Sequence, residues 1–143
     1  MRRVSRGDRG MAASVEAAIL LPVLILLIGL LVTTARIALA QQSLGAIASH
    51  AARAATLERT AAAGHAAARS AVQEGLAEHG LECLSSQIEV AAGALSASIG
   101  AQGEVTVTVS CTVPFTEVSI PGMPGSHQLT ATAVSSVDRF RQR

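Results

Sequence analysis

An uncharged and strongly apolar run from Ala17 to Ala35 limits what this chain can fold into. The run is nineteen residues long, is dominated by Leu, Ile and Val, and ends at Arg36. A helix of that length, at 1.5 Å per residue, spans about 28 Å, which is close to the thickness of the hydrocarbon core of a bilayer. Pro22 is expected within the first two turns of this helix, where a missing N–H group costs least. We therefore predict one transmembrane segment over residues 11–36.

The charges on the two sides of the run indicate its orientation. Asp8 is the only acid before Glu16, whereas Arg36 alone follows the run immediately. Because basic residues are retained on the cytoplasmic side, we expect residues 1–10 to form a basic cytoplasmic leader and the chain after Arg36 to lie outside the cytoplasm. The leader contains four arginines: Arg2, Arg3, Arg6 and Arg9.

A cleavable secretory signal is a second interpretation of the same segment. Ala38-Leu39-Ala40 is a small-residue triplet of the kind at which such signals end. However, nineteen apolar residues exceed the ~7 to 15 of a typical signal, and Glu16 and Arg36 lie where signals are normally neutral. Retention as a membrane anchor is therefore favoured.

Helical spacing of apolar residues continues beyond the membrane segment. From Leu44 to Leu76 these residues recur every three or four positions, with Leu57 off register. The pattern predicts one long, Ala-rich helix over residues 37–80, ended by His79-Gly80 because glycine adopts the left-handed cap. A break or bend is expected near one of its three glycines, Gly45, Gly64 and Gly75.

The small residues in the stretches "SHAARAAT" and "AAAGHAAARSA" have two explanations. Small side chains on one face allow another helix to approach closely. Alanine is also the most favourable helix former, and the absence of Lys beside abundant Ala and Gly indicates a GC-rich genome. The sequence leaves both explanations open.

After Ser85 the period of the apolar pattern changes from 3.6 to 2, which predicts short strands. The stretches concerned are 87–90, Glu104–Val113 and 127–137, and residues 113–128 are expected to form a turn-rich loop because they contain three prolines and two glycines. In the strongest strand, alternation predicts one buried and one wet face. The buried face would consist of Val105, Val107, Val109 and Cys111.

Together these patterns predict an α+β membrane protein. A single N-terminal transmembrane helix would continue into a long Ala-rich helix, followed by a small antiparallel β-sheet of about three strands. The expected parts are a leader (1–10), a transmembrane segment (11–36), an extracytoplasmic helix (37–80) and a small β-rich region (81–143). With two Phe, no Tyr and no Trp, few large side chains are present for a core.

Several functional classes lack their sequence signatures. Apart from Arg139-Phe140-Arg141, basic residues are not interleaved with aromatic ones, so nucleic-acid binding is not expected. The sequence has no Gly-x-Ser-x-Gly elbow and no phosphate-binding Gly-rich loop, so we predict no enzyme, no cofactor and no small-molecule substrate. No metal site is expected, because the four histidines are scattered without ligand spacing: His50, His65, His79 and His127.

Two cysteines, Cys83 and Cys111, follow the predicted long helix. By the predicted topology both lie outside the cytoplasm, where disulfides persist. We predict a disulfide between them, closing a loop of about 28 residues and stabilising a domain that is short of large apolar residues. Buried free thiols are the alternative.

The stretch "DRGMAASVEAAILLPVLILLIGLL" resembles the N-terminus of type IV pilin-like proteins. More narrowly, the chain is similar to the TadE-like family of tight-adherence (Flp) pilus assembly proteins, with an extracytoplasmic helix and terminal strands that agree in outline. The recurring elements, in order, are Arg9-Gly10, Val15-Glu16-Ala17 and Leu21-Pro22.

This resemblance implies a non-catalytic, pseudopilin-like or accessory component of pilus assembly in the bacterial cytoplasmic membrane. A prepilin peptidase would cut between Gly10 and Met11, and Glu16 would pair with the new α-amino group of a neighbouring subunit. The implied partners are other pilin-like membrane proteins, the assembly platform and membrane lipid. Five residues, 11–15, separate Gly10 from Glu16, where processed pilins have four.

Two alternatives remain open. Glu16 would also be favourable without a partner if it lay in the first turn of the helix, near the positive end of the helix dipole. The chain as a whole would alternatively be a secreted or membrane-tethered adhesin or protein-interaction module, with the apolar run serving only as signal or anchor.

Overall fold

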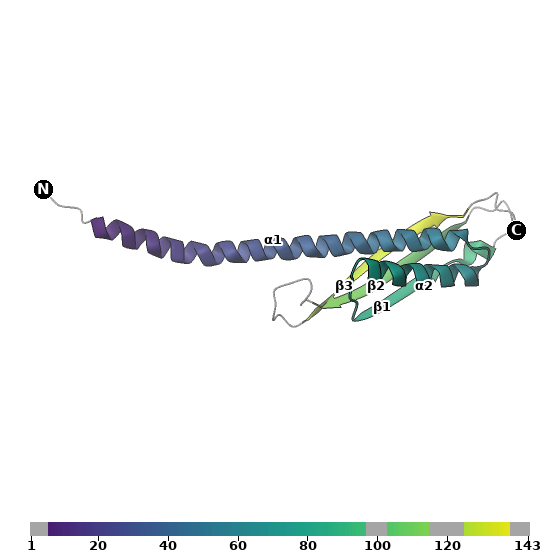
Figure 1. Cartoon of the computed structure of the whole chain (residues 1–143). Coiled ribbons are helices and arrows are strands. Elements are labelled where there is room, and N and C mark those ends of the chain that lie inside the picture. The colour runs from purple at the N-terminus through teal and green to yellow at the C-terminus, as the bar shows by residue number, and fades with distance from the viewer. Residues whose placement is uncertain (1–5, 97–102, 115–124, 138–143) are drawn as a thin grey trace. The chain divides into compact units, whose positions relative to one another are not determined.

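A long helix, α1 (Arg6–Leu57), begins the fold. The computed structural model describes residues 6–96, 103–114 and 125–137, with side chains from Glu16 onward. After α1 follow α2 (Ala61–Glu78), β1 (Ser85–Ala91), the short 3₁₀ helix η1 (Gly93–Ser96), β2 (Glu104–Pro114) and β3 (Ser126–Ser136) (Figure 1). The chain forms two compact units, Met1–Ala35 and Arg36–Arg143. The α+β prediction, with an apolar N-terminal helix and three antiparallel strands, is confirmed.

The start of α1 corrects the predicted place of Pro22. Because α1 begins at Arg6, Pro22 lies in the helix interior rather than in the first two turns. A proline there lacks the N–H group that would bond to the carbonyl four residues earlier, that of Ala18. Such prolines are tolerated in transmembrane helices because neighbouring groups satisfy the freed carbonyl.

The single helix predicted over residues 37–80 is wrong, because α1 ends at Leu57 and α2 begins at Ala61. Thr60 adopts an extended conformation, with φ −129° and ψ 152°, and its hydroxyl accepts a hydrogen bond from the Ala63 N–H group at 3.2 Å. This is an N-cap, which satisfies one of the free N–H groups at a helix start. The break therefore lies at a threonine cap and not at Gly45, Gly64 or Gly75, all of which remain inside helices.

A length argument explains why the chain folds back at this point. One helix of 44 residues would be about 66 Å long, whereas an eleven-residue strand reaches only about 36 Å. The far half of such a helix would have no sheet to cover it. The predicted end of the second helix is confirmed, since His79 is the C-cap and Gly80 has a φ of +62°.

The sheet has the order β1-β2-β3, with both pairs antiparallel. Its central strand, β2, alternates between buried and wetter positions along its length, so the predicted buried face is confirmed. On the opposite face, hydroxyl groups pair between strands, with Oγ1 of Thr108 at 3.1 Å from Oγ1 of Thr132 and Oγ of Ser110 at 3.2 Å from Oγ1 of Thr130. Most of the predicted turn-rich loop, residues 115–124, lies outside the described residues.

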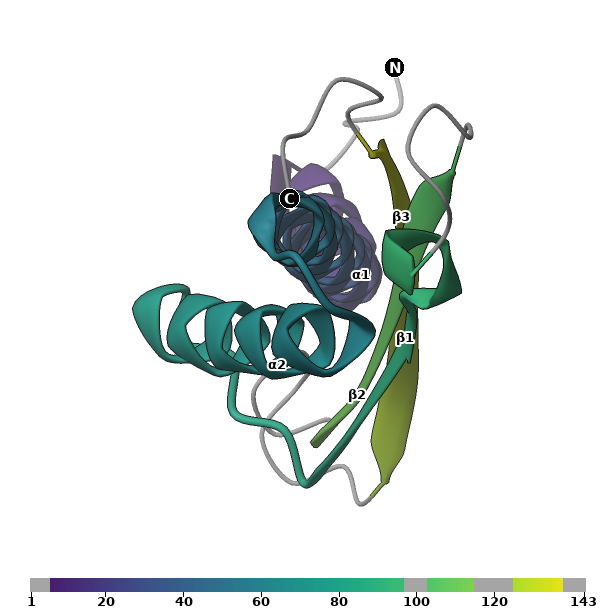
Figure 2. The ribbon, with the colours of Figure 1, turned by 90° about the vertical axis from the view of Figure 1, so that its right-hand side faces the viewer.

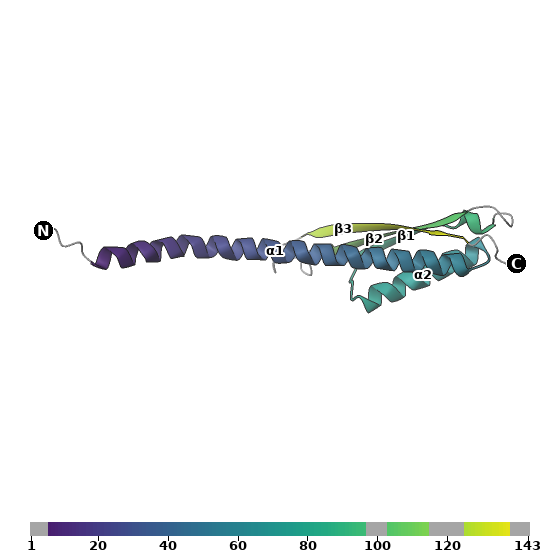
Figure 3. The same cartoon turned by 90° about the horizontal axis from the view of Figure 1, so that it is seen from above.

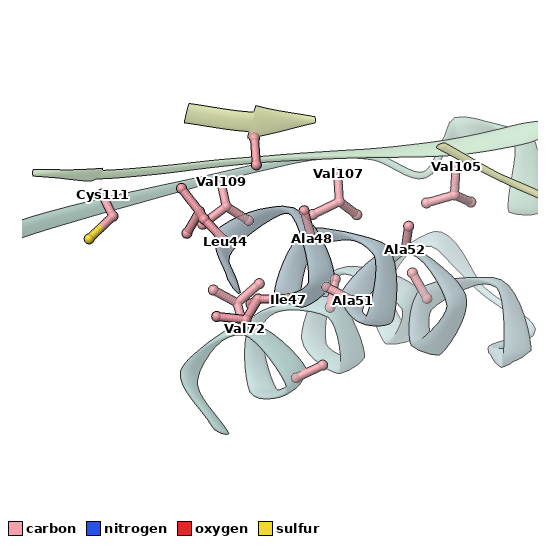
Figure 4. Packing of buried hydrophobic residues seen from close by; sticks show 14 of the residues in the cluster. Leu44, Ile47, Ala48, Ala51, Ala52, Val72, Val105, Val107, Val109 and Cys111 are labelled. Carbon is pink, nitrogen blue, oxygen red and sulfur yellow. The ribbon is translucent and has the colours of Figure 1, made fainter. Parts of the chain in front are cut away.

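The core of the second unit lies between α1 and β2. Leu44, Ala48 and Ala52 of α1 point toward the valines of β2, while Ile47 and Ala51 lie on the side of α2 (Figure 4). Figure 2 shows α1 and α2 on the same face of the sheet, and α2 also contacts β1 and η1. Seen from above, the three strands lie together on one side of the two helices (Figure 3). The core is therefore made mostly of Ala and Val, as the composition requires.

Glycine brings the two helices close together. A Cβ atom added at Gly75 in α2 would lie 2.9 Å from Cγ1 and 3.1 Å from Cγ2 of Ile47 in α1. A Cβ atom at Gly64 would lie 3.2 Å from the backbone oxygen of Ala55. The small residues along these helices thus serve close packing, which was one of the two explanations that the sequence left open.

A disulfide joins Cys83 to Cys111, which are 28 positions apart in the sequence and have 5.4 Å between their Cα atoms. Cys83 lies between α2 and β1, and Cys111 is fully buried on the core face of β2, beyond Val109 and Leu44 (Figure 4). The bond ties the end of the helical hairpin to the central strand at one end of the core.

We predict that Gly75→Ala lowers the free energy of unfolding of the second unit. The overpacking against Ile47 costs about 1–3 kcal/mol, and we expect it to outweigh the ~1 kcal/mol that alanine adds as a helix former. Gly45→Ala is the matched control, because nothing lies within 4 Å of its added Cβ atom, and it should be neutral or stabilising. Denaturant unfolding of the full chain in detergent measures both variants, and equal stabilisation of the two would contradict the close helix contact.

We also predict that loss of the disulfide lowers the free energy of unfolding by about 3 kcal/mol, because the unfolded chain regains loop freedom. The double variant Cys83→Ser, Cys111→Ala avoids burying a new hydroxyl group at the fully buried position. A reducing agent should destabilise the native protein equally and leave the double variant unchanged. Rapid labelling of both thiols in untreated membranes would show that the bond does not form in cells.

Candidate functional site

The apolar segment of α1, residues 17–35, presents hydrophobic side chains in every direction. Twelve Leu, Ile and Val side chains from Ile19 to Val32 are between 49% and 68% exposed. The helix contains an 18-residue window of mean hydropathy 2.7, which is long and apolar enough to cross a membrane. A helix that is hydrophobic all round requires an apolar environment on all sides, and lipid or the helices of other membrane proteins provide one.

The polar groups inside this segment are satisfied by the helix itself. Oγ1 of Thr33 donates to the carbonyl of Gly29 at 2.9 Å, and Oγ1 of Thr34 donates to the carbonyl of Leu30 at 2.8 Å. Both bonds reach back four residues, which is the usual way for a threonine to hide its hydroxyl group in a helix. These two hydroxyl groups therefore do not require water or a partner chain.

Two charged residues bound the apolar segment. Glu16 precedes it and Arg36 follows it, and the twenty helical steps from one to the other correspond to about 30 Å along the helix axis. This separation equals the thickness of a bilayer core, so both charges can reach the head-group regions. Glu16 is exposed and lies at the boundary where an ionised side chain can still contact water or another charge.

The position of Glu16 in α1 removes the helix-dipole explanation for the full-length chain. That explanation required Glu16 in the first turn, but α1 begins at Arg6, ten residues earlier. The dipole effect falls off within the first turn, and Glu16 is almost three turns away. The sequence alone missed this because the leader had no clear helix-start signal.

The bond between Gly10 and Met11 also lies inside α1, in its second turn. A protease cuts a locally unfolded backbone more readily than a hydrogen-bonded helix. Cleavage at this position would therefore require the first turns of α1 to unwind. Removal of residues 1–10 would make Met11 the first residue of the helix and would bring Glu16 into its second turn.

The histidines considered as metal ligands in the sequence analysis lie outside the apolar segment. His50 and His79 line a shallow groove between α1 and α2, together with Glu78. The groove exists because the chain folds back at Thr60, so the sequence pattern of one helix did not reveal it. Among the described residues, no group of three or more His, Cys, Asp or Glu side chains is arranged to hold a metal ion.

Comparison with known proteins addresses α1 alone. Residues 11–53 match the model of the TadE-like protein family. The match begins at Met11, immediately after Gly10, and ends at Arg53 within α1, so α2 and the sheet lie beyond it. No curated protein and no solved structure matches the chain. The resemblance seen in the N-terminal motif is confirmed by this match: residues 11–53 are similar to TadE-like proteins.

Proposed function

We propose that this protein is a pseudopilin-like or accessory component of tight-adherence pilus assembly, anchored in the bacterial cytoplasmic membrane by residues 11–36. One observation carries the proposal. The TadE-like match coincides with an all-round apolar helix that is bounded by Glu16 on one side and Arg36 on the other. The N-terminus would be cytoplasmic, and the unit from Arg36 onward would be extracytoplasmic, where the disulfide is stable.

In this proposal Glu16 pairs with a basic group of a neighbouring subunit. An ionised carboxylate at the edge of a bilayer is costly when unpaired, and it is favourable beside a positive charge where the dielectric constant is low. After cleavage between Gly10 and Met11, the new α-amino group of another copy, or of another pilin-like protein, would supply that charge. The pair would set the register of one apolar helix against the next.

The partners would be pilin-like membrane proteins, the pilus assembly platform and a prepilin peptidase. The apolar segment would contact these helices within the membrane, and the four parts 1–10, 11–36, 37–80 and 81–143 would act as leader, membrane segment, extracytoplasmic helical part and β-rich region. TadE-like pilus components are generally structural, which supports a role without catalytic activity.

We predict that Glu16→Gln leaves membrane insertion intact and abolishes pilus formation. The substitution keeps the size of the side chain and removes only its negative charge, so an ion pair between subunits is lost. Glu89→Gln is the control, because it removes a carboxylate from the exposed face of β1. Electron microscopy of cells and immunoblots of membranes measure piliation and insertion. Normal piliation with Glu16→Gln would exclude the pairing role.

Mass spectrometry of the protein extracted from membranes tests processing. We expect a mature chain beginning at Met11, because the peptidase would release residues 1–10. An intact Met1 would contradict cleavage while leaving the anchor in place. A chain beginning at Gln41 would instead support the secreted adhesin or interaction module, since most of the buried core, from Leu44 onward, would remain.

A further inference from the structure

The sheet of the second unit extends toward the end of that unit at which the apolar run stops. Figure 4 shows Val105 of β2 near Ala52 of α1 and Val109 near Leu44, so β2 runs in the opposite direction to α1. The C-terminal end of β2 therefore approaches Arg36, which belongs to this unit and ends the apolar run. The same end contains the start of β1 and the start of β3, because both pair antiparallel with β2.

A hydrogen bond fixes how far along α1 this end of the sheet reaches. Nε2 of Gln41 donates to the carbonyl of Thr130 at 2.7 Å, and Thr130 is paired with Ser110 of β2. From Gln41 to Arg36 the helix advances by about 7.5 Å, whereas from Ser110 to Pro114 the strand advances by about 13 Å. Projected on the helix axis, the strand's advance exceeds that of the helix unless the angle between strand and helix is larger than roughly 55°. At any smaller angle the strand reaches the level of Arg36. The end of the sheet therefore lies level with Arg36, the first residue of this unit.

We infer that this juxtamembrane end, formed by Leu84, Thr112–Pro114 and Ser126–Gln128, rests on the phospholipid head groups of the bilayer. Within the described part of the second unit the sheet reaches the level of Arg36, so a bilayer whose surface lies at Arg36 would meet the end of the sheet. The inference rests on the membrane anchor of the proposed function and adds lipid as the partner of a second surface.

The residues at this end suit the head-group region. The Leu84 N–H group donates to the carbonyl of Thr112 at 2.8 Å, which places Leu84 at the level of Arg36, and its side chain is 68% exposed. Ser85 follows Leu84 in the chain, and its hydroxyl group lies 3.1 Å from that of Thr112. Hydroxyl groups of this kind can form hydrogen bonds with phosphate and glycerol oxygens, while an exposed leucine beside them can bury apolar surface among the lipids.

Single tryptophan residues test the inference directly, because the chain contains no Trp and no Tyr. The full chain with Leu84→Trp is reconstituted into vesicles of phosphatidylethanolamine and phosphatidylglycerol that contain nitroxide-labelled lipid. We expect the fluorescence of this tryptophan to shift to shorter wavelength than in water. We also expect a nitroxide at the lipid head group to quench the fluorescence more strongly than a nitroxide at the end of the acyl chain. Each value is normalised to unlabelled vesicles, which removes quenching by the neighbouring disulfide.

Two matched variants interpret this measurement. Leu57→Trp, about 32 Å further along α1 than Arg36, should emit as in water and be quenched by neither label. Leu27→Trp, inside the apolar segment, should be quenched mainly by the chain-end label and reports on the anchor separately. Gln128→Trp, opposite Thr112 in β3, gives a second probe of the juxtamembrane end should Leu84→Trp fail to fold.

The outcomes separate the lipid contact from the anchor. Quenching of Leu27→Trp together with water-like emission from both Leu84→Trp and Gln128→Trp would overturn the lipid contact and leave the anchor standing. Absence of quenching at Leu27→Trp would overturn both. Piliation is not part of the readout, so a negative result for Glu16→Gln does not affect this test.

Discussion

The packing of α1 against β2 holds the second unit together. Leu44, Ala48 and Ala52 meet a row of valines, and the side chains are small enough for helix and sheet to lie close to each other. Close approach compensates for the shortage of large residues, because dispersion contacts grow as surfaces come nearer. The disulfide adds a covalent link at one end of this core, between the end of the helical hairpin and the central strand.

The same helix serves two environments. Over residues 17–35 it is apolar all round, which suits lipid or the helices of other membrane proteins. From Ile37 onward only one side is apolar, and small residues take over the positions that face the sheet and α2. The change occurs at Arg36, so one charged residue separates the apolar segment, which is long enough to cross a membrane, from the unit that contains the sheet. The TadE-like match covers both sides of this boundary.

Much of the fold was predictable because its signals are local. The alternation in Glu104–Val113 indicated a central strand with one buried face, and the Gly80 cap ended the second helix as expected. The break at Thr60 was missed because a threonine N-cap is a weaker sequence signal of a helix boundary than a glycine. The chain also folds back there because the sheet is short, and the length of the sheet is not a local property of this stretch. The early start of α1 was missed as well, and it changed the setting of Pro22 and Glu16.

By itself the sequence determined the apolar helix that could cross a membrane, its charged boundaries, the strands and the family motif, because hydrophobic period and charge act over neighbouring residues. Only the tertiary structure decided that α2 returns along α1, that Gly75 contacts Ile47, and that Cys83 meets Cys111. It also decided that the end of the sheet lies level with Arg36. These features join residues that are far apart in the chain. The residues meet because both helices must bury their apolar sides against one sheet of limited length.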